Sequence, residues 1–256
     1  MAEGRAVAVW GQVAAHAAAH GRRVSVADVC AVAVGSAGLG GGWLAAARGG
    51  GPDFVMCVTG PAAERLAELQ LMLGEGPCLD VLASAAPVLA ADLGDEEFSR
   101  RWPAFVPAAR GLGAGAVFVF PLVVGAIRAG VMGLYRGSPG PLPDGRLGDL
   151  LILADAATVM LLASADGGAD GGADGGADGQ AGAGLDGQAP DLALHRAEID
   201  QATGMLAVQL GVPAGAAFAR LRAYAYSQDR RLAEVAGDIV ARRLRLDRDP
   251  RPDGGP

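Results

Sequence analysis

Apolar residues between positions 5 and 163 follow two spacings, one typical of strands and one typical of helices. Short apolar runs bounded by glycine or proline predict strands, and they lie at Gly42–Ala47, Phe54–Val58, Val88–Ala91, Ala116–Val124 and Val131–Tyr135. The glycine-rich stretches 48–53 and 125–130 predict two hairpins. Hairpins mixed with helices indicate an α+β fold, an antiparallel sheet with flanking helices.

The helical spacing appears in several segments around these strands. A first helix carries Val9, Trp10, Val13, Ala14 and Ala17 on one face, and a last one carries a stripe from Leu147 to Leu161. Ser25 is an expected N-cap, with Asp28 at the third helical position. Pro61 is expected to open another helix, whose face holds Leu66, Leu69, Gln70 and Leu73. Residues 96–110 also have helical spacing, although Pro103 and Pro107 should break or kink that helix.

Residues 164–190 have the composition of a linker. Ala-Asp-Gly-Gly repeats at 165–168, 169–172 and 173–176, and Leu185 is the one large apolar residue in the segment. Glycine at this density is costly to order, so a disordered linker is expected. A calcium-binding repeat is the alternative, but such repeats have a period of nine and an apolar anchor.

Residues 192–246 show helical spacing alone. Leu192, Ile199, Ala202, Leu206 and Leu210 form one face of a first helix that Gly211 should end. Pro213 begins a second helix with Ala217, Phe218, Leu221 and Tyr224 expected to face inward, and a third helix carries Leu232, Val235, Ala236, Ile239 and Val240. Three short helices bury little apolar surface, so pairing with a second copy is expected.

The distribution of charged residues along the chain indicates where a nucleic acid could bind. Of its 256 residues, 51% are hydrophobic, all 21 basic residues are arginine, and the net charge is −7. Residues 1–190 hold 11 arginines and 19 acidic residues, whereas residues 192–246 hold 8 arginines and 5 acidic residues. Any nucleic-acid contact is therefore expected in the C-terminal quarter.

The same composition bears on location. The longest uncharged stretches, Val29–Ala47 and Gly111–Ile127, contain glycines or a proline, so neither is expected to span a membrane. Three cysteines (Cys30, Cys57 and Cys78) cannot form a closed set of disulfides. Reduced thiols and a cytoplasmic location are therefore expected.

Two groups of motifs resemble known families. In the N-terminal part they are GEGPCLD at 74–80 (the 74–80 motif), RWPAF at 101–105, FPL at 120–122, RAGV at 128–131 and LY at 134–135. Together these resemble the GAF domain of many actinobacterial regulators. In the C-terminal part, IDQATGML at 199–206, FARLRAYA at 218–225 and RRLAEVA at 230–236 resemble an ANTAR domain. The chain is thus expected to hold a GAF sensor at 5–163, the linker at 164–190, an ANTAR domain at 191–247 and a flexible tail at 248–256.

The resemblance implies an RNA-binding antitermination regulator. ANTAR domains act as dimers in which each copy binds one hairpin loop of a tandem pair. The GAF domain implies that the protein senses a signal, which can be a small-molecule ligand. Unstacked loop bases are read by aromatic stacking and by arginine planes. The RNA-binding residues expected on this basis cluster in ten positions, namely Arg222, Tyr224, Tyr226, Arg230 and Arg231.

Each of these positions also has a structural interpretation. Tyr224 has the spacing of a core residue, Tyr226 that of a surface residue, and an arginine on a helix usually faces solvent. Arg242, Arg243 and Arg245 suit the dipole at the end of the last helix. Gly204 in mid-helix predicts a close helix approach at a dimer or domain interface. Thr203 and Asp229 stand where many relatives have Lys and Asn.

The N-terminal part offers little chemistry. Haem and metal sites are not expected, because the three histidines (His16, His20 and His195) lie outside the sheet region. Cys78 fits a buried apolar thiol better than a redox sensor. A methionine-sulfoxide reductase is the enzyme alternative, but the cysteines lack that family's sequence context, so no catalysis and no cofactor are expected. A DNA-binding regulator and a protein-interaction module remain as alternative functions.

Overall fold

The computed structural model describes residues 2–48, 51–166 and 189–246. The chain divides into two compact units, Met1–Leu192 and Ala193–Pro256, and each is described by itself. Most of the predicted linker, residues 167–188, and the predicted tail lie outside the described residues. At the two ends of that linker, helix α7 continues to Asp166 and helix α8 begins at Ala189.

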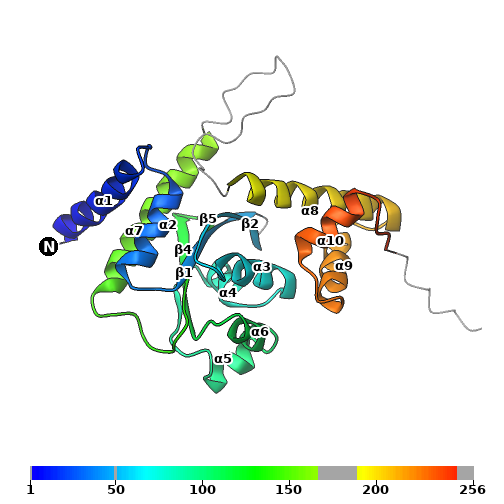
Figure 1. The fold of residues 1–256 in the computed structure, drawn as a ribbon, viewed down its shortest axis with the longest axis horizontal. Helices are drawn as coiled ribbons and strands as arrows, with labels where there is room; N and C mark the ends of the chain where they lie inside the picture. The colour runs from blue at the N-terminus through cyan, green and yellow to red at the C-terminus, as the bar shows by residue number, and fades with distance from the viewer. Residues whose placement is uncertain (1, 49–50, 167–188, 247–256) are drawn as a thin grey trace, which may run out of the picture. The chain divides into compact units, whose positions relative to one another are not determined.

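The N-terminal unit is built on a five-stranded sheet in the order β2-β1-β5-β4-β3 (Figure 1). All neighbouring strands are antiparallel, and the strands are β1 Gly41–Arg48, β2 Gly51–Thr59, β3 Val88–Ala90, β4 Ala116–Val124 and β5 Ile127–Arg136. Both predicted hairpins are confirmed. The second turn is shorter than predicted, because Val124 pairs with Ile127 and Gly125 turns the chain at a φ of 58°.

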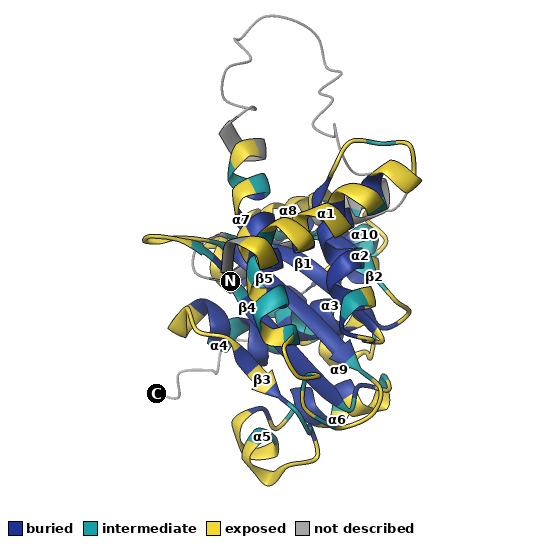
Figure 2. Ribbon diagram, turned by 90° about the vertical axis from the view of Figure 1, so that its left-hand side faces the viewer, coloured by how far each residue is buried: buried dark blue, intermediate teal, exposed yellow. Residues whose placement is uncertain are grey.

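Helices cover both faces of this sheet. On one face lie α2 (Val26–Ser36) and α7 (Arg146–Asp166), with α1 (Ala2–Ala19) packed against both of them. On the other face lie α3 (Ala63–Leu73), α4 (Pro77–Ser84), α5 (Glu96–Arg101) and α6 (Phe105–Gly111). Figure 2 shows buried strands and a largely exposed α1. Burial on both faces explains why the strands appear as continuous apolar runs.

Two of the predicted helices differ in the structure. The segment 96–110 forms two helices, because the chain leaves the helical conformation at residues 102–104, which include Pro103. Pro107, however, does not break α6, because it is the third residue of that helix, where the backbone N–H has no intrahelical acceptor. Helix α4, whose first half lies inside the 74–80 motif, was not predicted from the hydrophobic spacing.

The 74–80 motif joins neighbouring helices through its side chains. The Glu75 carboxylate accepts backbone N–H groups of Ala104 and the next residue, at 2.6 and 2.7 Å. The Asp80 carboxylate accepts the indole N–H of Trp102 at 2.8 Å. These bonds tie the start of α4 to the break between α5 and α6, so the motif is explained by packing.

The C-terminal unit consists of three helices, as predicted: α8 (Ala189–Leu210), α9 (Ala214–Ser227) and α10 (Leu232–Val240). Gly211 follows α8 with a φ of 66°, which fits its expected role at the helix end. The expected inner face of α9 was partly wrong. Its buried residues are Ala217, Leu221 and Ala225, whereas Phe218 and Tyr224 are half-buried at the sides.

Among the described helices, none alone is long and apolar enough to cross a membrane. The segments 197–210 and 214–227 are long and apolar enough only when taken together, and their axes are bent by 108° relative to each other. The apolar faces of this pair are buried within the C-terminal unit.

Candidate nucleic-acid interface

One side of α9 carries an aromatic and basic stripe of three residues at a spacing of four, Phe218, Arg222 and Tyr226 (the α9 stripe). The guanidinium of Arg222 lies 5.6 Å from the centre of the Phe218 ring. Burial lowers the pKa of the Arg222 guanidinium. Tyr226, one turn further on, is 59% exposed. An arginine held over one ring beside an exposed second ring is a surface on which an unstacked base can stack.

Tyr224 does not belong to this stripe. Two residues along a helix rotate the side chain by about 200°, so Tyr224 and Arg222 lie on different sides of α9. The side chain of Tyr224 is half-buried, in agreement with the packing interpretation. Of the five predicted RNA-binding residues, Arg222 and Tyr226 therefore lie in the α9 stripe and Tyr224 lies outside it.

The turn between α9 and α10 places the other two arginines. Asp229 has a φ of 48°, a left-handed conformation that asparagine and aspartate tolerate best after glycine. The Asn-to-Asp difference from many relatives thus keeps the backbone conformation and adds a negative charge. Arg231 then occupies the N-cap position of α10.

Arg230 is held in place by acidic residues of α10. Its Nη2 lies 2.7 Å from an oxygen of Asp238, and its Nε lies 3.9 Å from Glu234. The second oxygen of Asp238 accepts the Nε of Arg243 at 2.8 Å. The hydrogen bond to Asp238 raises the pKa of Arg230, and the two arginines lower the pKa of Asp238. Asp238 therefore orients two guanidinium groups at once.

These residues line an open cleft of about 310 Å³, the α10 cleft, in the C-terminal unit. Its lining consists of His195, Glu198, Arg230, Arg231, Ala233, Glu234, Gly237, Asp238 and Arg243. Three arginines thus lie among three carboxylates. The sequence interpretation assigned Arg243 to the helix dipole and missed Asp238, although opposite charges at 230, 234 and 238 have the i, i+4, i+8 spacing of paired side chains.

The remaining positions singled out in this unit have local roles. The Thr203 hydroxyl donates to the backbone oxygen of Ile199 in its own helix at 2.7 Å. A Cβ at Gly204 would meet no atom within 4 Å beyond its own helix, so the expected close approach is not made by the described residues of the C-terminal unit. Arg242 and Arg245 are exposed and lie outside the cleft lining.

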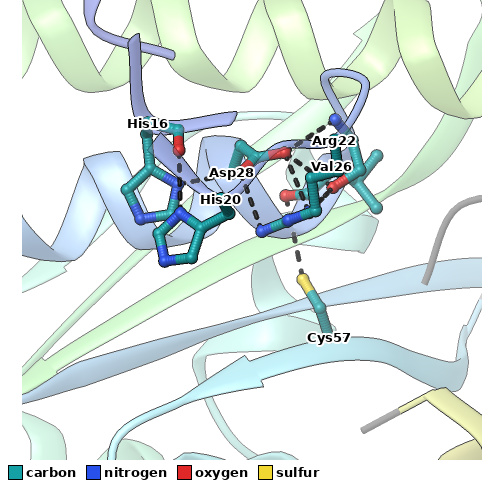
Figure 3. A network of polar contacts seen from close by, with 7 residues as sticks. His16, His20, Arg22, Val26, Asp28 and Cys57 are labelled. Atoms are coloured by element: carbon teal, nitrogen blue, oxygen red, sulfur yellow. Dashed lines mark hydrogen bonds and ion pairs between the residues drawn. The ribbon is translucent and has the colours of Figure 1, made fainter. Parts of the chain in front are cut away.

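The N-terminal unit contains a buried polar network that fixes α1 against α2 (Figure 3). Asp28 is inaccessible to solvent, and its carboxylate is bound by Nδ1 of His16 at 2.8 Å and by Arg22 at 2.9 Å. The backbone N–H of Ser25 also donates to Asp28 at 2.8 Å, which confirms the predicted N-terminal acid of α2. Burial alone would raise the pKa of Asp28, but these hydrogen bonds and the Arg22 charge together lower it.

The histidines of this network are already engaged. His16 binds Asp28, and Nδ1 of His20 lies 2.8 Å from the backbone oxygen of His16. Within residues 2–48, 51–166 and 189–246, no three His, Cys, Asp or Glu side chains converge to hold a metal ion.

Comparison with known proteins gives the class of the C-terminal unit first. The family model of the ANTAR domain matches residues 192–240, so the chain carries an ANTAR domain formed by α8, α9 and α10. The N-terminal unit has the α+β fold with an antiparallel sheet that the GAF resemblance implied. No curated protein matches the chain.

Solved structures resemble the N-terminal unit at low identity. The GAF domain of the phosphoenolpyruvate-protein phosphotransferase from Acinetobacter is 12% identical with a TM-score of 0.47, and the match covers 66% of this chain and 97% of that one. The GAF-B domain of DevS from Mycobacterium smegmatis is 20% identical with a TM-score of 0.40, and the match covers 56% and 93%.

Proposed function

We propose that this protein is a signal-responsive regulator that binds nascent RNA hairpins through its ANTAR domain and promotes transcription antitermination. The observation that carries the proposal is the ANTAR match at 192–240 on a unit that exposes the α9 stripe and the α10 cleft. The N-terminal unit senses the input, the protein acts in the cytoplasm, and it has no catalytic role.

The two surfaces of the ANTAR domain contribute differently to RNA binding. Tyr226 and Arg222 offer an exposed ring and a guanidinium plane to an unstacked loop base. In the α10 cleft, Asp238 offsets part of the positive charge of Arg230 and Arg243. We expect these two arginines to fix the position of an RNA phosphate but to add little to the affinity. Arg222 should therefore contribute more to affinity than Arg230.

Dimerisation supplies the second RNA-binding copy. The outer faces of α1 and α7 expose apolar side chains, with Val7 at 72% and Trp10 at 41%, together with Leu147, Leu151 and Val159. Two copies that pair through these helices bring two ANTAR domains to one transcript. After one hairpin is bound, the second ANTAR domain of the dimer is held at a high effective concentration near the second hairpin, which a monomer cannot provide.

Crosslinking of the full-length protein to RNA in cells, followed by sequencing of the bound transcripts, tests the proposal. Enrichment of transcripts with two adjacent hairpins upstream of a terminator is expected. Bound transcripts without such paired hairpins, or no transcripts above an uncrosslinked control, would contradict the proposal and favour the DNA-binding or protein-interaction alternatives.

Matched arginine variants test the site. Arg222→Ala and Arg245→Ala remove the same charge, but Arg245 is exposed and outside both surfaces. Loss of a stacking contact costs about 1–3 kcal/mol per base, so Arg222→Ala should weaken binding about five- to 150-fold. Arg245→Ala should change affinity little. Equal effects of both variants would contradict the assignment of the α9 stripe.

A further inference from the structure

Two of the three cysteines lie side by side in the N-terminal core, although they are on different elements. Cys30 is on α2 and Cys57 is on β2, and both are buried. Cys57 points from the sheet towards α2, and its sulfur lies 3.9 Å from the backbone oxygen of Val26, one helical turn before Cys30 (Figure 3). From the same strand, the Thr59 hydroxyl lies 3.8 Å from the sulfur of Cys30.

The two thiols differ in acidity. Interaction with Cys57 lowers the pKa of the Cys30 thiol, whereas interaction with Cys30 together with burial raises the pKa of the Cys57 thiol. Cys30 is therefore the more acidic thiol of the pair and the better nucleophile, and Cys57 is the less acidic one. Cys78 is the contrasting case, because burial raises the pKa of its thiol to about 12.

The position of Cys57 gives this pair a route to solvent. Strand β2 is the edge of the sheet, and its pairing with β1 is shifted at two places, between Leu44 and Ala45 and between Ala46 and Ala47. Edge strands with irregular pairing open locally at lower cost than central strands. A small molecule can therefore reach Cys57 and Cys30 without global unfolding.

We propose that Cys30 and Cys57 form a reversible dithiol–disulfide site that reacts with hydroperoxides. This goes beyond the proposed function, because it names a class of signal for the N-terminal unit. The site does not depend on RNA binding for its chemistry.

The reaction balances with one peroxide and two thiols. The Cys30 thiolate attacks the terminal peroxide oxygen, so that an S–O bond forms and the O–O bond breaks. The leaving hydroxide of hydrogen peroxide, or alkoxide of an organic hydroperoxide, takes a proton to become water or an alcohol. The Cys57 sulfur then attacks the sulfenic acid of Cys30; the S–S bond forms, the S–O bond breaks, and the leaving hydroxide takes the Cys57 proton. Two electrons pass from sulfur to oxygen, and a small dithiol reverses the change by exchange.

Peptide mapping of the native full-length protein tests the site directly. Cleavage after arginine places the cysteines on three different peptides, 24–48 with Cys30, 49–65 with Cys57 and 66–100 with Cys78. After exposure to hydrogen peroxide, alkylation in denaturant and digestion without reductant, we expect peptides 24–48 and 49–65 to be joined and two hydrogens lighter. Dithiothreitol should release them, and Cys78 should be recovered alkylated.

Two variants are matched controls. Cys78→Ala removes a buried thiol outside the pair and should leave the joined peptides unchanged. Cys57→Ala should instead leave a sulfenic acid on Cys30, trapped by dimedone. Because mapping of the wild-type protein needs no variant, a folding defect in either one does not block the test. Absence of the joined peptides, their formation only in urea, or oxidation of Cys78 at an equal rate would overturn the proposal.

Discussion

Replacing Asp28 with alanine should destabilise the N-terminal unit far more than any other single charge removal near α1. The Asp28 carboxylate is fully buried and accepts hydrogen bonds from His16, Arg22 and Ser25. Removal of one partner of a buried ion pair costs about 3–5 kcal/mol, because the other charge stays buried without a partner. The side chains of Arg22 and His16 are 21% and 32% exposed and can recover some solvation, which favours the lower end of that range.

Asp149→Ala is the matched control. Asp149 also binds α1, through Arg5 at 2.6 Å, but the side chain of Arg5 is 45% exposed. Ion pairs of this exposure contribute about 0–1 kcal/mol. Both aspartates are thus partners of α1, and they differ in burial.

Urea unfolding followed by tryptophan fluorescence measures the difference, since all three tryptophans lie in the N-terminal unit. With a slope of about 2 kcal/mol/M, Asp28→Ala should lower the midpoint by about 1.5–2.5 M and Asp149→Ala by less than about 0.5 M. Similar shifts for the two variants would refute the claim that the buried network fixes α1.

The pH dependence has a definite sign. The pKa of Asp28 is lowered in the folded state, so its stabilisation is fully present above the ordinary value of 3.8 and is lost as the pH falls through the lowered pKa. The midpoint difference between wild type and Asp28→Asn should therefore be largest above pH 3.8 and should shrink as the pH falls below that value.

Three further perturbations follow from single contacts. Gly133→Ala would place a Cβ inside the Trp43 ring, so the same urea midpoint should fall by the equivalent of about 1–3 kcal/mol or more. Residue 229 has a φ of 48°, which asparagine tolerates and alanine does not. In thermal unfolding followed by circular dichroism at 222 nm, Asp229→Asn should leave the midpoint of the ANTAR domain unchanged within about 1 °C, whereas Asp229→Ala should lower it by the equivalent of about 1 kcal/mol. Deletion of residues 165–172 should change the affinity of the full-length protein for a two-hairpin RNA only a few-fold in a filter-binding assay, because a Gly-rich linker sets only the effective concentration of the two domains. Abolished binding with an unchanged dimer would show that linker length carries the signal.

The sheet and the three C-terminal helices could be predicted because their hydrophobic spacing is unambiguous. Helix α4 could not, since Gly74, Gly76 and Pro77 indicate a turn, and its packing depends on the distant bond from Asp80 to Trp102. The short second turn was missed because β5 begins with two exposed residues, Ile127 and Arg128, inside the glycine-flanked stretch that predicted the turn.

The candidate site was predictable as a cluster in sequence but not as a surface. Ten consecutive positions with two tyrosines and three arginines can be identified without a structure, and the helical period already separates Tyr224 from Arg222. The position of the Arg222 guanidinium over the Phe218 ring, however, follows only from the structure. The Asp238 contact with Arg230 depends on the turn before α10, where Asp229 is left-handed, and the contact with Arg243 depends on the turn that follows α10. The Cys30–Cys57 pair likewise requires the packing of α2 on β2.

The affinity of the full-length protein for a tandem-hairpin RNA, compared with the same RNA after one loop is closed into duplex, tests the central claim most directly. The transcript most enriched by crosslinking supplies the sequence, and titration at fixed salt supplies the two dissociation constants. Binding by paired ANTAR domains predicts that the tandem RNA binds at least about tenfold more tightly than the single hairpin. Equal affinity for the tandem RNA, the single hairpin and an unrelated duplex would contradict hairpin recognition by this protein.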